Sequence, residues 1–249
     1  MAINNGDTRI AIVAETTKGF TPATPAFLLV DHLPGSKIAE AGDSNSSNTR
    51  KAGRTSSGQV VSGRRAEGTI QSELKRDAAT ELLLASAFCG SWQGDVLKGG
   101  KTDTSFTVEQ TFYDGDAEHI RRATGVQASF SLECEYNGFA TATFELLGLG
   151  CEHEVEPIAD ATYVNASTKP FIRGEKVTNV VIGGLNGVIP TKLSLSVMPE
   201  REAKGGFGSL SAAFIGTGKK QVEGSLTFLA SDLAGMNLTG ERINISFQM

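Results

Sequence analysis

Alternating apolar and polar residues dominate this chain and predict β-strands along most of its length. The clearest run spans 126–136, where every second residue from Val126 to Tyr136 is apolar and the residues between are polar. In a strand, successive side chains point to opposite faces, so a repeat of two residues indicates one apolar and one polar face. Asn137-Gly138 follows, a pair typical of tight hairpin turns, and the alternation resumes over Ala140–Leu146. We therefore predict an antiparallel hairpin with one buried face and one solvent-facing side.

Further strands are expected on both sides of this hairpin. The stretch 58–74 reads as one strand, or as two with a bulge at Gly63 or Gly68. Shorter apolar or alternating runs predict strands at 8–15, 27–32, 104–113, 193–197, 222–228 and 243–247.

The period changes to a helical one over 77–89. Apolar residues recur there at spacings of three and four, and the segment is rich in alanine and leucine. Asp77 suits the N-cap position and Gly90 suits the C-terminal end. The sequence therefore predicts one helix, whose apolar stripe is formed by Ala78, Ala79, Leu82, Leu83, Ala85, Phe88 and Cys89.

Residues 40–57 carry no apolar period and are rich in serine, asparagine and glycine. We expect a long exposed loop, and loops of this size in a compact domain are usually functional or disordered. Its second half is basic, with Arg50, Lys51 and Arg54.

Together these elements predict a mainly β fold, an antiparallel β-sandwich or barrel with one flanking helix and one long polar loop. We expect residues 1–150 to form a β-sandwich with the helix. Residues 151–249 either complete that sandwich or form a second, repeat-like β module. The glycine-bounded segments 138–148 and 206–216 resemble each other, which fits a duplicated module as well as it fits two unrelated hairpins.

Composition narrows the function classes. The chain has 249 residues, 23 lysines and arginines against 28 aspartates and glutamates, and a formal net charge of −5. A protein whose whole surface grips nucleic acid needs a cationic excess, so that class is disfavoured. Three unevenly spaced cysteines predict no disulfide framework. Because neither a signal peptide nor an apolar run of about 18 residues is present, we expect a soluble protein made in the cytoplasm.

Catalytic signatures are missing from the sequence. No stretch matches a phosphate-binding G-x-x-x-x-G-K-[ST] loop or a G-x-S-x-G nucleophile turn. Cys151-Glu152-His153 alone brings possible metal ligands together, and it lacks the spacing of zinc sites. We therefore expect no enzyme activity, no cofactor and no metal.

The order of segments resembles the tail tube proteins, or major tail proteins, of long-tailed bacteriophages. The likeness is clear over about residues 20–150 and looser over the C-terminal third. It rests on the order of several stretches rather than on one motif. These stretches are 21–27, 50–57, the strand 58–74, the helix 77–89, 95–100, 105–109, 124–130 and the strand 140–148.

The resemblance implies a structural virion protein that assembles into stacked, usually hexameric, rings. These form a hollow tube through which genomic DNA passes during ejection. Its partners would be further copies of itself, the tape measure, tail tip and terminator proteins, and double-stranded DNA that slides through without specific binding. It implies no cofactor and no membrane anchor. The protein would be made in the bacterial cytoplasm and located in the phage tail.

Two sets of residues are candidates for these roles. Arg50, Lys51 and Arg54 in the polar loop are candidates for contacts between rings. The solvent-facing side of the predicted hairpin is our candidate for the lumen wall, because an acidic or neutral polar wall does not grip phosphate. It comprises Gln127, Ser129, Ser131, Glu133, Glu135, Thr141, Thr143 and Glu145.

Three alternatives remain at this stage. The first is another ring-forming component, such as a tail terminator or a secretion-tube protein. The second is a monomeric β-sandwich binding module, which predicts a cluster of surface aromatic residues. The third is an enzyme, which predicts titratable side chains gathered in a pocket.

Overall fold

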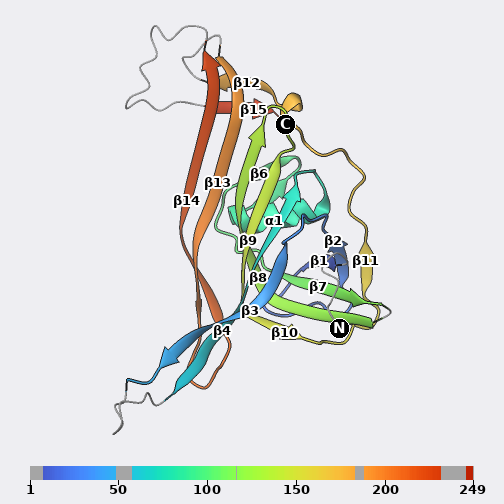
Figure 1. The fold of residues 1–249 in the computed structure, drawn as a ribbon, viewed down its shortest axis with the longest axis vertical. Helices are drawn as coiled ribbons and strands as arrows, with labels where there is room; N and C mark the ends of the chain where they lie inside the picture. The colour runs from blue at the N-terminus through green and yellow to red at the C-terminus, as the bar shows by residue number, and fades with distance from the viewer. Residues whose placement is uncertain (1–7, 49–57, 116, 183–187, 231–244, 249) are drawn as a thin grey trace.

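A computed structural model describes residues 8–48, 58–115, 117–182, 188–230 and 245–248 (Figure 1). It is mainly β, with 61% strand and 7% helix, as the alternating pattern predicts. The strands are β1 (Thr8–Ala14), β2 (Ala26–Leu29), β3 (Lys37–Ser46), β4 (Gln59–Glu73), β5 (Ser91–Gln93), β6 (Val96–Lys98), β7 (Phe106–Asp114), β8 (Ala117–Glu135), β9 (Thr141–Gly148), β10 (Gly150–His153), β11 (Thr162–Val164), β12 (Thr178–Ile182), β13 (Val188–Lys204), β14 (Phe214–Ala230) and β15 (Ile245–Gln248). The helices are α1 (Ala78–Phe88) and a short 3₁₀ turn at Gly174–Lys176.

The long strand β8 belongs to two half-sheets. Its N-terminal part pairs with β7 and β10, and its C-terminal part pairs with β9 and β13. The pairing with β7 shifts register beside Gly125, whose φ of +62° lies in the region that favours glycine. The first half-sheet therefore has the order β11-β2-β1-β7-β8-β10, and the second has the order β3-β4-β9-β8-β13-β14. The named pairs in both are antiparallel, except that β11 and β2 are parallel.

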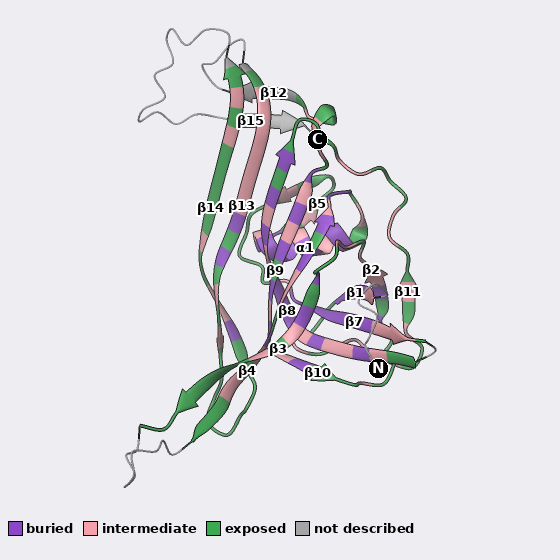
Figure 2. Ribbon diagram, viewed as in Figure 1, coloured by how far each residue is buried: buried purple, intermediate pink, exposed green. Residues whose placement is uncertain are grey.

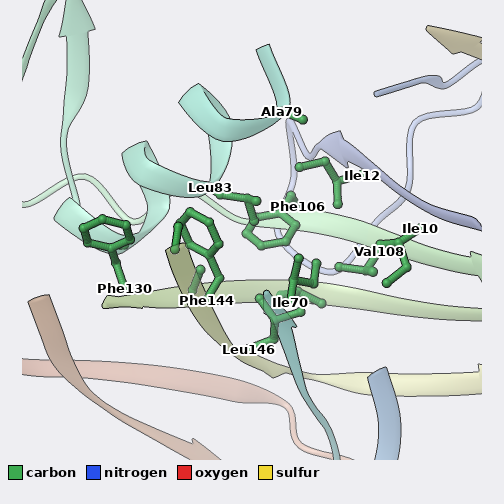
Figure 3. Packing of buried hydrophobic residues seen from close by; sticks show 14 of the residues in the cluster. Ile10, Ile12, Ile70, Ala79, Leu83, Phe106, Val108, Phe130, Phe144 and Leu146 are labelled. Atoms are coloured by element: carbon green, nitrogen blue, oxygen red, sulfur yellow. The ribbon is translucent and has the colours of Figure 1, made fainter. Parts of the chain in front are cut away.

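Both half-sheets contribute to one hydrophobic core (Figure 3). Ile12 and Phe106 come from the first half-sheet, Ile70 and Phe144 from the second, and all four are at most 1% exposed. Buried and exposed residues alternate along β8 and β9, as Figure 2 shows. A shared core between two halves of a folded-over sheet is consistent with the predicted sandwich.

Helix α1 lies where the sequence places it. The carboxylate of Asp77 accepts a hydrogen bond of 2.8 Å from the backbone N–H of Thr80, and so caps the first turn. At the other end the left-handed residue is Cys89, with φ +48°, rather than the expected Gly90. Ala79, Leu83 and Ala87 enter the common core, so the helix closes the core between the half-sheets (Figure 3).

The expected loop at about 40–57 is shorter than predicted, and this part of the prediction is wrong. Residues up to Ser46 belong to β3, which pairs with β4 as far as Ser46 opposite Gln59. The error has a physical cause: this end of the hairpin is exposed on both faces, so no apolar alternation marks it. Residues 49–57, including Arg50, Lys51 and Arg54, lie outside the described residues.

Strand β4 is continuous, and the register shift in its pairing with β3 falls beside Gly63, whose φ is +61°. This confirms one of the two bulge positions predicted. The two similar glycine-bounded segments have different structures. Residues 138–148 contain β9, whereas 206–216 contain most of the turn between β13 and β14.

Candidate functional site

The outward side of the second half-sheet carries mainly polar residues over its six strands, and we call it the polar face. Strand register aligns Ser129, Ser131 and Glu133 of β8 with Glu145, Thr143 and Thr141 of β9. All six are exposed or half-buried, while the residues that alternate with them on β8, such as Phe130 and Leu132, are buried. The hairpin predicted from alternation therefore presents the solvent-facing side expected of it.

The polar face is wider than the sequence pattern predicts. The register adds residues from four more strands to the same side of the half-sheet. Their alternation is visible in the sequence, but the strand order, which pairs segments more than fifty residues apart, is not. The added residues are Lys37 and Ala39 of β3, Glu67, Thr69, Gln71 and Glu73 of β4, Lys192, Ser194 and Ser196 of β13, and Glu223 and Ser225 of β14.

Negative charge is in excess on the polar face. Lys192 Nζ lies 3.1 Å from Glu135 Oε1 and 3.6 Å from Glu133 Oε2. These carboxylates raise the pKa of Lys192 above its usual value. Among the residues of the polar face, six carboxylates accompany two lysines: Glu67, Glu73, Glu133, Glu135, Glu145 and Glu223 against Lys37 and Lys192.

Gln127 is a correction to the predicted set. Its alternation places it on the polar face, but its exposed fraction is 0%. It pairs with Leu147 and shares a hollow with Met198 and Arg201, which come from β13. Because Gln127 is buried, it does not belong to the solvent-facing set. Alternation along one strand cannot predict burial near a strand some seventy residues away.

The polar face is also hollowed. One depression of about 610 Å³ is lined by residues of β3, β4, β8, β9 and β13, including Glu67, Ser129 and Glu145. A second, of about 480 Å³, is lined by Gln71, Ser131, Glu133, Thr141 and Thr143, among others. Together the two depressions give this side of the half-sheet a concave relief.

The second half-sheet has an open strand at each edge. Among the described residues, β3 pairs only with β4 and β14 pairs only with β13. The residues of β14 from Gln221 to Leu229 are exposed or half-buried. Strand β14 has 17 residues. An edge strand whose outer side has no partner strand is a template for another strand, and proteins that remain monomeric usually block such edges.

No group of three histidine, cysteine, aspartate or glutamate side chains that could hold a metal ion comes together in the part of the chain that the structure describes. Cys151 of the Cys-Glu-His stretch is buried, and burial raises the pKa of its thiol to about 11. Nearby, His119 Nδ1 lies 2.8 Å from Glu154 Oε2, and this partner raises the pKa of the imidazole. Within the same described residues, no helix has the length and apolarity needed to cross a membrane.

Comparison with known proteins identifies a family. A family model described as phage tail tube protein matches residues 6–249. No curated protein matches the chain. Since the match covers nearly the whole sequence, the chain belongs to the phage tail tube protein family, whose members have a structural role in the tail of the virion.

Proposed function

We propose that this phage tail tube protein forms hexameric rings that stack into a hollow tube, through which genomic DNA passes during ejection. The observation that carries the proposal is the second half-sheet, which combines a polar face with an open strand at each edge. A sheet with two different open edges can continue from one subunit to the next, and a ring removes every edge.

The proposed contact within a ring joins β14 of one copy to β3 of the next. Such an interface is heterologous, because the two surfaces that meet are different, and it closes when the rotation per subunit divides a full turn. Backbone hydrogen bonds would provide much of the affinity, as in other cases of strand addition. The polar faces of the subunits would then lie side by side in a continuous wall.

Proline substitution at two consecutive positions of β14 tests this contact. Successive residues of a strand direct their N–H groups to opposite sides, and proline removes that donor. Of the variants Val222→Pro and Glu223→Pro, one breaks the pairing with β13 and the other alters only the open edge. We expect the edge variant to keep the circular dichroism spectrum and monomer stability of the wild type and to form no rings in negative-stain electron microscopy. Normal rings from both variants would refute the contact.

We further propose that the polar face lines the lumen. A basic wall would release counterions and hold the phosphates of DNA, whereas a wall with an excess of carboxylates lets the duplex slide. The candidates from the hairpin, without Gln127, are Ser129, Ser131, Glu133, Glu135, Thr141, Thr143 and Glu145. The excess of carboxylates over this half-sheet supports that assignment.

Arg50, Lys51 and Arg54 remain proposed anchors between rings. Contacts between exposed charges weaken with ionic strength. Replacing all three with serine should therefore make tubes dissociate at lower salt than wild-type tubes do. Identical salt dependence, measured by sedimentation of assembled tubes, would exclude this role.

Residues 151–249 are proposed to act with residues 1–150 in one ring subunit. The pairing of β13 with β8 supports this, because it places β14 at the edge of the half-sheet that carries the polar face. The proposed partners outside the tube are the tape measure, tail tip and terminator proteins.

A further inference from the structure

The turn between β13 and β14, residues 205–213, carries an unusual exposed aromatic residue. We call this segment the hairpin tip. Phe207 is 114% exposed and Leu210 is 64% exposed. The tip contains no charged residue, and glycines stand on both sides of Phe207. A fully exposed phenylalanine contributes nothing to the core of its own subunit. Together with Leu210 it leaves an apolar surface at the tip that is free to contact another molecule.

The hairpin tip is held in place, so Phe207 projects from a fixed base. The backbone N–H of Arg64 in β4 donates to Leu210 O at 2.9 Å, and that of Ala212 donates to Arg64 O at 2.8 Å. Within the tip, Ser209 N–H donates to Gly206 O at 3.2 Å. A pre-positioned aromatic side chain loses little conformational freedom on binding, which favours affinity.

An apolar hollow lies around the opposite end of the same two strands. Its lining includes Tyr136 after β8, Val177, Pro190 and Leu193 of β13, and Leu226 of β14. Tyr136 is 64% exposed. The volume of about 80 Å³ is room for several water molecules, which an apolar side chain can replace. In Figure 1 the tip and this end of β13 and β14 lie at opposite ends of the molecule.

We infer that Phe207 of one copy inserts into this hollow on a second copy, and that this contact stacks one ring on the next. The inference rests on the proposed function. If the open edges of β14 and β3 close the ring, then the strand ends necessarily face the neighbouring rings. An apolar projection at one end and an apolar hollow at the other end form a heterologous pair that propagates without limit.

The occupant is a second copy because the two surfaces match in chemistry and in number. The uncharged tip suits a hollow whose lining is mainly apolar. The two charged residues in that lining, Glu135 and Lys192, pair with each other, so no charge is left unpaired. Each copy carries one projection and one hollow, so every hollow in a stack is filled except at the terminal ring. Aromatic side chains set into pockets are the residues that most often dominate binding energy.

Phe207→Ser tests the contact by electron microscopy and sedimentation velocity. We expect the variant to form rings, because the strand edges are unchanged, and to lose stacked tubes or to require at least tenfold more protein to form them. The matched control is Phe20→Ser, which alters a phenylalanine that is 70% exposed on a different loop and should leave the tubes unchanged. Normal tubes from Phe207→Ser would overturn this inference alone. A wild-type protein that forms no rings at any concentration would overturn the proposed function and this contact together.

Cysteine cross-linking gives an independent test. The three native cysteines are buried. In assembled Gly206→Cys/Thr191→Cys protein, which keeps Phe207 and Tyr136, oxidation should produce a ladder of covalent multimers, because a disulfide needs the two Cα atoms within about 7 Å. A side chain at Gly206 meets no neighbour, and Thr191 lines the hollow. The single variants and the pair Gly206→Cys/Val164→Cys, with Val164 on β11, should yield no ladder. A ladder from the control pair, or none from the test pair in intact tubes, would contradict the inference.

Discussion

At the scale of single residues, Glu15 organises one corner of the first half-sheet. Oε1 accepts hydrogen bonds from Thr107 Oγ1 at 2.9 Å and from the backbone N–H of Gly125 at 2.8 Å. Oε2 accepts from Ser105 Oγ and from the N–H of Gly19, both at 2.8 Å. One carboxylate thus joins the loop after β1, the start of β7 and the bulge where β8 passes between half-sheets.

The first prediction concerns this group. In Glu15→Gln an NH₂ group, which donates hydrogen bonds, replaces one carboxylate oxygen, which accepts them. The two donors that faced that oxygen then lose their acceptor. We expect the free energy of unfolding to fall by about 2–3 kcal/mol, the usual cost of unsatisfied partners of a charged acceptor, measured by urea denaturation. Glu202→Gln is the control. Glu202 pairs with Lys204 at an exposed position, and loss of that pair should cost well under ~1 kcal/mol. Equal losses would show that the four contacts carry no stability.

The second prediction uses the titration of Cys151. Its pKa rises to about 11 because burial penalises the thiolate, whereas the thiol of the unfolded chain titrates near its ordinary value of about 8.5–9. The folded state therefore binds the proton more tightly, and stability is lost as pH rises from about 9 to 11. The free energy of unfolding of the wild type should therefore fall relative to that of Cys151→Ala over this pH interval. All other titratable groups are the same in the two proteins, so their contributions cancel in the comparison. A difference that stays constant from pH 8 to pH 10.5 would contradict this.

At the scale of elements, helix α1 depends on caps from both its own sequence and the β13–β14 hairpin. Asp77 satisfies the N–H of Thr80 at its start. At its end, Arg201 Nη2 donates to Ser86 O at 2.8 Å, and Lys220 Nζ donates to Phe88 O. These cations complement the negative end of the helix dipole and fasten the hairpin to the helix.

The third prediction follows from the N-cap. Asp77→Ala should lower the free energy of unfolding by about 1 kcal/mol, because one backbone donor of the first turn loses its acceptor. Asp77→Asn should retain most of that stability, since its side-chain oxygen can still accept. Thermal and urea denaturation check both variants, and an alanine variant as stable as the asparagine variant would exclude a capping role.

How far the sequence predicts this fold depends on where apolar alternation exists. The hairpin of β8 and β9 and the helix were predictable, because each has one buried face that leaves a regular apolar period. The end of β3 was not, because both of its faces are exposed and only its partner strand specifies it. Gln127 illustrates a third limit. It is buried and shares a hollow with Met198 and Arg201 of a distant strand, and a local pattern does not show which distant residues lie nearby.

At the scale of the whole molecule, the two half-sheets have different surfaces. The second carries the wide acidic polar face and both open edges, whereas the first ends in short strands. The residues selected from the sequence lie on β8 and β9, at the centre of the polar face. They do not include its extension over β4 and β13. Finding those strands requires the sheet order, which is a property of the folded chain.

The fourth prediction tests the polar face in the assembled tube. Glu133→Lys/Glu135→Lys reverses two charges and removes both partners of Lys192. We expect tubes that retain DNA in a salt-dependent manner and phage with slower DNA ejection and lower titre. The control Glu118→Lys/Glu152→Lys makes the same change in charge at exposed positions of the first half-sheet and should behave as wild type. Ejection unaffected by the first pair would refute the assignment of the lumen wall.

The length of the β13–β14 hairpin has a consequence for the period of the tube. Suppose that Phe207 of one copy occupies the hollow of the next copy along the tube. The axial rise per ring then equals the distance, along the tube axis, between Phe207 and the hollow within one copy. Seventeen residue steps separate Phe207 from Pro190, the β13 residue in the lining of the hollow that is farthest from the tip. At ~3.3 Å each, this gives an upper limit of about 56 Å for the backbone span. The hairpin would thus act as a ruler. The axial rise per ring, measured from the layer lines of tube images, should not exceed this limit. Inserting two residues in each strand should lengthen the rise by at most ~7 Å.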